Sequence, residues 1–244
     1  MDQIESAERA VVCALFRAFP QTFVWIGGSV LHLLHASPRA SYDLDLCPQR
    51  DEPPARAVAA VVRSALAELN PALGSEFALQ PAEAAGASSF LRLTITEHRT
   101  PAFLVDFTRI AGRIRDTTAV VLESLLGPQA VVVPTDSSLL LLKLQALLFR
   151  RFLKAADVFD VWFLSSRGVR VSKHQRDLLS GEVRVRELGF AEVKERLNRL
   201  TAERFLADLR RRVLPEVFHG WSPARAQSAM QAVVRLVRRE IRWA

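Results

Sequence analysis

Cysteine, lysine and long uninterrupted apolar segments are all scarce in this chain of 244 residues. Two cysteines, Cys13 and Cys47, are too few for a disulfide framework, and no CxxC or Cys/His cluster indicates zinc. The most apolar stretch, residues 138–149, is interrupted by Lys143 and is too short to cross a bilayer. The acidic start, MDQIESAERA, lacks the basic region of a secretory signal. These absences predict a soluble cytoplasmic protein.

Lysine is rare because arginine takes most of the basic positions: only four of the 33 Lys and Arg residues are lysine. The net charge of +7 is divided unevenly along the chain. Residues 1–150 hold 13 Lys and Arg against 15 Asp and Glu, a balance of −2, whereas residues 151–244 hold 20 against 11, a balance of +9. A basic half of this kind indicates a surface for phosphates or nucleic acid, and solvated helix faces are the alternative.

Hydrophobic periodicity divides the chain into two parts. In the first part we expect helices at residues 5–18, 29–36 and 54–69, the last with Pro54 in its first turn, and strands at residues 23–26, 43–46, 89–96, 102–108 and 130–133, with a turn at residues 98–101. After Pro134 the strand pattern stops, and helices are expected at residues 138–151, 154–166, 172–180, 190–212 and 222–242. The sequence therefore predicts an α+β protein, with a core domain over residues 1–134 and a helical domain with a basic surface over residues 135–244.

Three aspartates on predicted strands are candidates for a metal site. Asp43 and Asp45 stand two residues apart on one strand, so their side chains point to the same face. Two carboxylates this close repel each other unless a cation lies between them, and oxygen ligands of this kind suit Mg²⁺. Asp106 is a lone acid in an apolar strand and needs a partner if it is buried. A solvated acidic pair and a half-solvated strand are the alternatives.

Two glycines and a serine, Gly27, Gly28 and Ser29, precede this strand at the start of a predicted helix. Glycines let the backbone approach a phosphate closely, and the first N–H groups of a helix, with the positive end of its dipole, attract anions. The serine hydroxyl adds a donor. The turn therefore indicates a phosphate-binding site next to the metal site, and a tight turn that needs glycine only for its geometry is the alternative.

The order of these motifs resembles the nucleotidyltransferase superfamily, and more narrowly the AbiEii/AbiGii-type toxins of bacterial toxin–antitoxin systems. These toxins close their first motif with Arg-x-Thr/Ser-x-Asp-Leu-Asp, which reads RASYDLD at residues 39–45 here. Their later motif reads KLQAL at residues 143–147, then Arg150, Lys154 and DVFD at residues 157–160. The similarity covers about residues 22–165. It departs from the family pattern at Ala156, where a basic residue usually precedes the first aspartate.

The resemblance implies a mixed-sheet nucleotidyltransferase core followed by an all-helical part. The metal ligands that it implies are Asp43, Asp45 and Asp106, which are also catalytic residues together with Lys143 and Asp157. The substrate-binding residues that it implies are Gly27, Gly28, Ser29, Arg39, Ser41, Arg150 and Asp160.

Lys143 is also singled out by its surroundings. It is the only lysine in the first 150 residues, and it lies within a strongly apolar run. On a helix, Lys143 shares one face with Leu147 and Arg150. A buried lysine needs an anionic partner, which a nucleoside triphosphate or Asp157 could provide. Both interpretations, a catalytic cation and a structural ion pair, stay open.

The expected reaction is transfer of a nucleotide from an NTP with release of pyrophosphate, assisted by two Mg²⁺ ions. The resemblance implies that the acceptor is the 3′ end of tRNA, that the modification blocks translation, and that an antitoxin protein is a partner; no membrane partner is expected. The arginines expected to contact RNA phosphates are Arg210, Arg211 and Arg212 and, on one helix face, Arg235, Arg238, Arg239 and Arg242. Two alternatives are an antibiotic nucleotidyltransferase acting on an aminoglycoside or lincosamide, and a catalytically inactive binding module.

Overall fold

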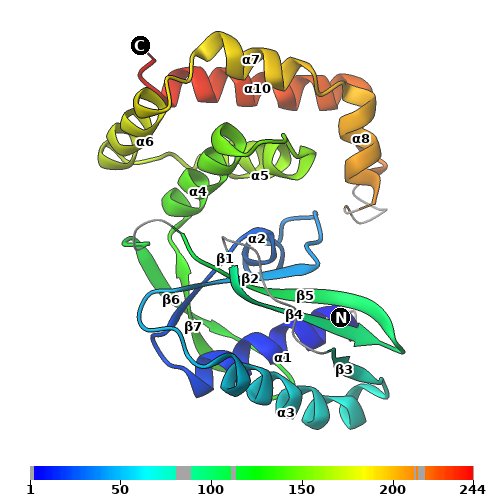
Figure 1. Cartoon of the computed structure of the whole chain (residues 1–244). Helices are drawn as coiled ribbons and strands as arrows, with labels where there is room; N and C mark the ends of the chain where they lie inside the picture. The colour runs from blue at the N-terminus through cyan, green and yellow to red at the C-terminus, as the bar shows by residue number, and fades with distance from the viewer. Residues whose placement is uncertain (1–2, 81–88, 111–113, 212, 214–217, 244) are drawn as a thin grey trace. The chain divides into compact units, whose positions relative to one another are not determined.

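The computed structural model describes residues 3–80, 89–110, 114–211, 213 and 218–243. The chain consists of two compact units. Unit 1 comprises Met1–Ala36 and Ser41–Pro134, and unit 2 comprises Ser37–Ala40 and Thr135–Ala244. Unit 1 combines a mixed sheet with helices, whereas the elements described in the long segment of unit 2 are helices (Figure 1). The α+β fold class predicted from the sequence is confirmed.

Unit 1 is built from three helices and seven strands among its described residues. The helices are α1 (Gln3–Ala18), α2 (Gly28–His35) and α3 (Ala55–Leu73). The strands are β1 (Phe23–Ile26), β2 (Asp43–Pro48), β3 (Phe77–Leu79), β4 (Ser89–Glu97), β5 (Thr100–Thr108), β6 (Thr117–Leu122) and β7 (Gln129–Pro134).

The larger sheet has the strand order β1-β2-β5-β4-β3. Strand β2 pairs parallel with β5, and the remaining neighbours in this sheet pair antiparallel. Strands β4 and β5 form a hairpin whose turn residues, His98 and Arg99, both have positive φ angles, of 47° and 68°. Strands β6 and β7 form a separate antiparallel pair, and β7 packs against β1 and α1. This arrangement places β2 and β5 side by side in the sheet.

Helices α1 and α3 pack against each other, as Figure 1 shows. Residues with apolar side chains at helical spacing, such as Val58, Val62 and Leu69 of α3, are completely buried there. Helix α3 begins at Ala55, so Pro54 is its N-cap rather than part of its first turn, and the helix continues past Pro71 to a left-handed C-cap at Gly74. Helix α1 also contacts β5 and β7, and α3 contacts β3, so the two helices pack against the strands of unit 1.

The sequence patterns did not predict strands β3 and β6. Strand β3 has three residues, too few to display a period. Strand β6 reads TTAVVL, and its burial does not alternate; Val121, for example, is 66% exposed. Both strands are defined by pairing with a partner strand, and pairing cannot be read from the local sequence.

Unit 2 contains the following described helices: α4 (Asp136–Phe149), α5 (Ala155–Ser166), α6 (Lys173–Val185), α7 (Phe190–Asn198), α8 (Ala202–Arg210) and α10 (Pro223–Glu240). Its core contains an aromatic cluster in which Trp221 contacts Phe159, Trp162 and Phe205, with ring centroids 5.6, 4.9 and 5.9 Å away. This cluster joins α5 and α8. None of the described helices is long and apolar enough to cross a membrane.

The single helix predicted over residues 190–212 is wrong. The structure has two helices there, α7 and α8, and the second begins at a new N-cap, Thr201, whose hydroxyl accepts a hydrogen bond from the Arg204 N–H. A threonine that caps the backbone stabilises a helix start and so favours a break. Arg212 lies outside the described residues. Helix α10 ends at Glu240, so Arg242 does not continue the helix face predicted for four arginines.

Candidate active site

Two aspartates occupy paired positions on neighbouring strands of unit 1. In the parallel register of β2 and β5, Asp45 lies opposite Asp106 and Asp43 lies opposite Leu104. Residues directly opposite each other point to the same face of a sheet, about 5 Å apart at Cβ. Asp43 and Asp45 are half-buried and alternate with the fully buried Leu44 and Leu46. The sheet therefore presents Asp43, Asp45 and Asp106 on one face.

Gly27 allows Asp45 to occupy its position. A Cβ atom at Gly27 would lie 2.2 Å from Asp45 Oδ2, far inside van der Waals contact. Gly27 also has a φ of +91° and is the N-cap of α2. Glycine is thus required here both for its backbone conformation and for the carboxylate next to it. Gly27 of the predicted turn and Asp45, a predicted metal ligand, are therefore in direct contact.

Ser29 lies deeper than a surface phosphate ligand would. Its side chain is completely buried, and its Oγ accepts a hydrogen bond of 2.9 Å from Trp25 Nε1. This bond ties the first turn of α2 to strand β1. The backbone at Gly27 and Gly28, which is the start of α2, is the part of the motif that can offer N–H donors to an anion.

Arg92 is a site residue that the sequence reasoning missed. It lies opposite Asp106 in the β4–β5 hairpin, and its guanidinium pairs with Asp106 Oδ2. The other carboxylate oxygen, Oδ1, is buried without a hydrogen-bond partner. Counting outward from the turn would not have found Arg92, because Arg92 lies six residues before His98 and Asp106 lies seven residues after Arg99; the register shift between Ile95 and Thr96 takes up the extra residue. A buried carboxylate oxygen without a partner is unfavourable, and a cation would satisfy it.

The donor set fits Mg²⁺, since three carboxylates on one sheet face provide oxygen ligands. Among the described residues, however, no group of three or more His, Cys, Asp or Glu side chains is arranged so as to hold a metal ion. Asp106 is turned toward Arg92 through one oxygen and keeps the other unpaired. Binding of a metal by all three residues would therefore require rotation of their side chains, with no change in strand register.

Unit 2 contains a second charged group, centred on Asp160. Arg39 donates two hydrogen bonds to this carboxylate, from Nε and Nη2, each 2.8 Å long, and Lys143 Nζ lies 2.7 Å from Asp160 Oδ2. The three side chains are between 1% and 11% exposed. Burial alone raises the pKa of Asp160, but the charges of Lys143 and Arg39 outweigh it and hold the pKa below its ordinary value of 3.8. Two cations thus surround one carboxylate.

The structural partner predicted for Lys143 is wrong, because Lys143 pairs with Asp160 instead of Asp157. Asp157 is itself 4% exposed and pairs with Arg150, whose Nη1 lies 2.7 Å from Asp157 Oδ2. Asp157 and Asp160 stand three residues apart on α5 and lie on the same side of it, so spacing alone could not choose between them.

The remaining predicted residues lie in different surroundings. Ser41 is buried at the start of the second segment of unit 1. Of the arginines predicted to bind RNA, Arg239 pairs with Glu240, Arg242 lies 3.6 Å from Asp177, and Arg238 stacks on Phe190 at 5.8 Å. Their guanidinium groups therefore already take part in contacts within unit 2.

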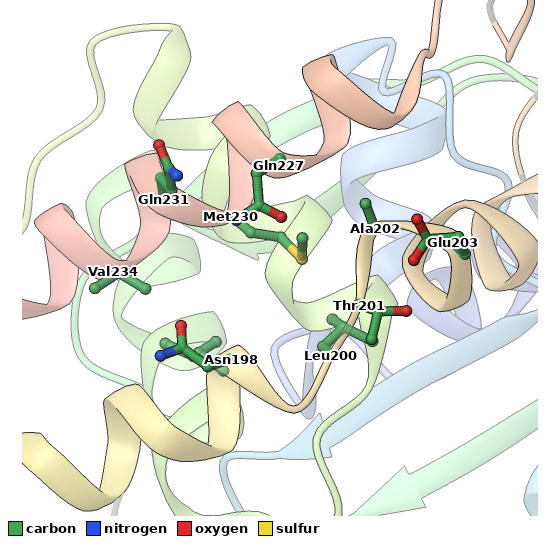
Figure 2. Close-up of a pocket in the computed structure, with 10 residues that line it drawn as sticks. Asn198, Leu200, Thr201, Ala202, Glu203, Gln227, Met230, Gln231 and Val234 are labelled. Atoms are coloured by element: carbon green, nitrogen blue, oxygen red, sulfur yellow. The ribbon is translucent and has the colours of Figure 1, made fainter.

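Unit 2 contains a pocket between the α7–α8 junction and α10, with a volume of about 330 Å³. Figure 2 shows the residues that line it. Asn198, Thr201, Gln227 and Gln231 give it polar walls, and Met230 lies among them. Its lining contains no Lys, Arg or His, and none of the site residues predicted from the sequence. A pocket without cations is unsuited to a phosphate group.

Comparisons with known proteins identify the family and the fold of the chain. The family model described as nucleotidyl transferase AbiEii toxin, type IV TA system, matches residues 10–232. The crystal structure of JHP933 from Helicobacter pylori is similar with a TM-score of 0.54 and 16% identity, over 97% of this chain and 90% of that one. A candidate nucleotidyltransferase from H. pylori gives a TM-score of 0.55 and 14% identity, over 97% and 94%. A comparison with curated proteins gave no match.

Proposed function

Because the chain belongs to the AbiEii family of nucleotidyltransferase toxins, we propose that it transfers a nucleotide from an NTP to an RNA hydroxyl, with Mg²⁺ as cofactor and the 3′ end of tRNA as acceptor. The observation that carries this proposal is the paired position of Asp45 and Asp106 on β2 and β5, with Asp43 on the same face. The buried, unpaired Oδ1 of Asp106 supports a role in binding a cation.

In this proposal Asp43, Asp45 and Asp106 hold the metal. Mg²⁺ bound there would supply positive charge that activates the acceptor hydroxyl and stabilises the leaving pyrophosphate. Arg92 holds Oδ2 of Asp106 and leaves Oδ1 for the cation. The backbone at Gly27 and Gly28 provides N–H donors for a phosphate at the start of α2. These residues bind and orient the reactants.

Lys143 is proposed to bind the triphosphate. The group formed by Arg39, Lys143 and Asp160 contains two positive charges and one negative charge, all largely buried. An excess positive charge in a buried place favours an anionic ligand. Lys143 is the member that keeps some exposure, with 11% of its side chain accessible. Arg39 and Asp160 then position Lys143, and Arg150 and Asp157 form the neighbouring ion pair.

The acceptor is proposed to be RNA because residues 151–244 carry 20 Lys and Arg against 11 Asp and Glu. Phosphate contacts dominate the electrostatics of RNA binding. The type IV toxin family also implies an antitoxin as a partner of this chain. Modification of tRNA at its 3′ end would block aminoacylation and so stop translation.

The test is incubation of the protein with each of the four labelled NTPs, Mg²⁺ and total tRNA, followed by separation on a denaturing gel. We expect label in the tRNA band with at least one NTP, and loss of that label when EDTA removes the metal. If no RNA is labelled with any NTP and an aminoglycoside or lincosamide is modified, the antibiotic-modifying alternative replaces this proposal.

Asp45→Ala should lower the rate of transfer by at least about 10²-fold. It removes one of the carboxylates proposed to hold Mg²⁺, whose charge stabilises the transition state. The fold should stay intact by circular dichroism. Without Mg²⁺ the melting temperature should hold or rise, because the change relieves repulsion between Asp43 and Asp45. Asp51→Ala, at a nearby acid outside the three-carboxylate face, is the matched control. A variant at residue 45 with the wild-type rate would refute the metal assignment.

A further inference from the structure

The loop between α4 and α5 exposes an aromatic ring. Phe152 is 70% exposed, which makes it the most exposed aromatic side chain in the described part of the chain. Its neighbours in the loop read Arg150, Arg151, Phe152, Leu153 and Lys154. A single exposed apolar residue is common on protein surfaces, but an exposed benzyl ring among cations is a combination that single-stranded nucleic acids recognise.

Three contacts hold the loop in place. Arg196 of α7 donates hydrogen bonds to the backbone carbonyls of Leu148 and Arg150, 2.8 and 2.7 Å long. Arg150 is in turn paired with Asp157 at the start of α5. These contacts hold the loop backbone just before Phe152 and tie it to α5. A backbone that is already held in place loses little conformational entropy when a ligand binds next to it.

The loop that carries the ring is positively charged. The guanidinium of Arg151 lies over the Phe152 ring, 5.1 Å from its centroid, and Lys154 is exposed. No Asp or Glu occurs between Asp136 and Asp157, and the Asp157 carboxylate is already paired with Arg150. Arg151 and Lys154 therefore remain to attract phosphates on either side of the ring.

We propose that Arg151, Phe152 and Lys154 form a binding site for single-stranded RNA, in which a base stacks on Phe152 and the adjoining phosphates contact the two cations. Every base has a flat face, so this site selects an unpaired segment and not a sequence. Its ligand is the unpaired end of the acceptor RNA, an identification that rests on the proposed function. All three residues of the site belong to unit 2.

The test measures binding of a short, fluorescein-labelled single-stranded RNA to the full-length chain by fluorescence anisotropy, without NTP or metal. Phe152→Ala should weaken binding about 10-fold, the loss typical of one stacked base. Phe152→Trp should bind as tightly as the wild type, because it keeps a flat ring. The matched control is Leu178→Ala, which removes another exposed apolar side chain, 51% exposed on α6, and should leave binding unchanged.

Salt dependence separates the stacking ring from the cations. Phe152→Ala should keep the wild-type slope of log affinity against log salt, since it removes no charge. Arg151→Gln should make that slope shallower by about 0.7, the value for one lost phosphate contact on a single strand. A Phe152→Ala variant that loses affinity and slope together would overturn the stacking role.

Equal RNA affinity of Phe152→Ala and wild type overturns this inference and assigns the exposed ring to a protein partner instead. That result is distinct from failure of the proposed function. If the wild type labels tRNA while Phe152→Ala binds RNA normally, the function stands and the stacking site falls. If Phe152→Ala weakens RNA binding while the wild type labels no RNA, the stacking site stands and the proposed acceptor falls.

Discussion

At the scale of single residues, Gly27 and Asp45 constrain each other, because they lie too close together for a side chain at residue 27. The carboxylate of Asp45 fills the space that a side chain at residue 27 would need. The carboxylate face and the glycine turn are therefore linked by direct contact, and a change at either residue affects the other.

Gly27→Ala should destabilise the protein more than an ordinary glycine substitution at positive φ. Alanine in this backbone region, which is essentially confined to glycine, costs about 1–3 kcal/mol, and its Cβ must also displace Asp45 Oδ2. Gly74→Ala is the control for an ordinary positive-φ glycine, since Gly74 lies in the left-handed region with a φ of +63° and no atom lies within 4 Å of the added Cβ. Urea unfolding should give the larger loss at residue 27.

A double-mutant cycle isolates the contact with the carboxylate. In an Asp45→Ala background the added methyl at residue 27 meets no carboxylate, so its cost should fall to that of the backbone strain alone. Equal costs of Gly27→Ala in both backgrounds would mean that Asp45 moves aside freely and does not constrain the turn.

Asp160 gives the stability of unit 2 a dependence on acid. Its pKa is held below the ordinary value of 3.8, so its stabilising charge is fully present above pH 3.8 and is lost as the pH falls through the lowered pKa. At pH 7, Asp160→Asn should cost about 3–5 kcal/mol, because Arg39 and Lys143 are left buried without an anion.

The cost of Asp160→Asn should shrink as the pH falls below 3.8, because the Asp160 carboxyl of the unfolded chain then takes up a proton and the folded carboxyl follows at its lower pKa. Unfolding curves of both proteins at pH 7, 4.5 and 3 measure this difference. A cost that stays constant across this range would show that the Asp160 charge does not stabilise the fold.

At the scale of helices and strands, the break between α7 and α8 is the feature that the sequence pattern concealed. Apolar residues continue with helical spacing across residues 190–212, and the break at Thr201 depends on one side-chain hydrogen bond. Hydrophobic periodicity indicates which residues face the core. It does not show where a helix ends and a new N-cap begins inside a continuous apolar pattern.

Thr201→Ala should destabilise unit 2 by about 1 kcal/mol, the usual value for losing an N-cap. Thr201→Ser should retain most of the stability because serine keeps the hydroxyl that accepts from the Arg204 N–H. Chemical denaturation of both variants gives the comparison. Equal stability of the alanine and serine variants would contradict the capping role.

Most long elements could be predicted from the sequence, as the patterns of α1, β1, α2 and β2 show. The strand pairing that brings Asp45 beside Asp106 could not, because it depends on which strands become neighbours in the sheet. Arg92 was missed because a register shift within the β4–β5 hairpin, which the sequence does not show, sets it opposite Asp106. The motif residues Arg39, Lys143 and Asp160 could be named from the family resemblance, but their mutual contacts came only with the structure.

At the scale of the whole molecule, the chain passes between the two units three times: after Ala36, after Ala40 and after Pro134. The short segment Ser37–Ala40 belongs to unit 2, where Arg39 binds Asp160 and forms an isolated bridge with Val213. A residue encoded in the first fifth of the sequence therefore completes the core of the last helices.

Arg39→Met should loosen unit 2 although residue 39 lies far from it in sequence. Asp160 would keep only Lys143 as a partner, so backbone amides of α5 should exchange hydrogen at least about 10-fold faster. The amides of α1 and α3 should be unaffected. Arg63→Met, at an exposed position of α3, is the control. Faster exchange in unit 1 alone would contradict this assignment.

The segment Ser37–Ala40 also limits how the protein can be cut and recombined. A fragment that begins at residue 135 carries Asp160 and Lys143 but leaves Arg39 behind. A chimaera that exchanges the C-terminal helices of two family members at residue 135 would combine Arg39 from one parent protein with Asp160 from the other. Successful recombination would therefore need the tetrapeptide and the helices to be inherited together, as a single discontinuous module.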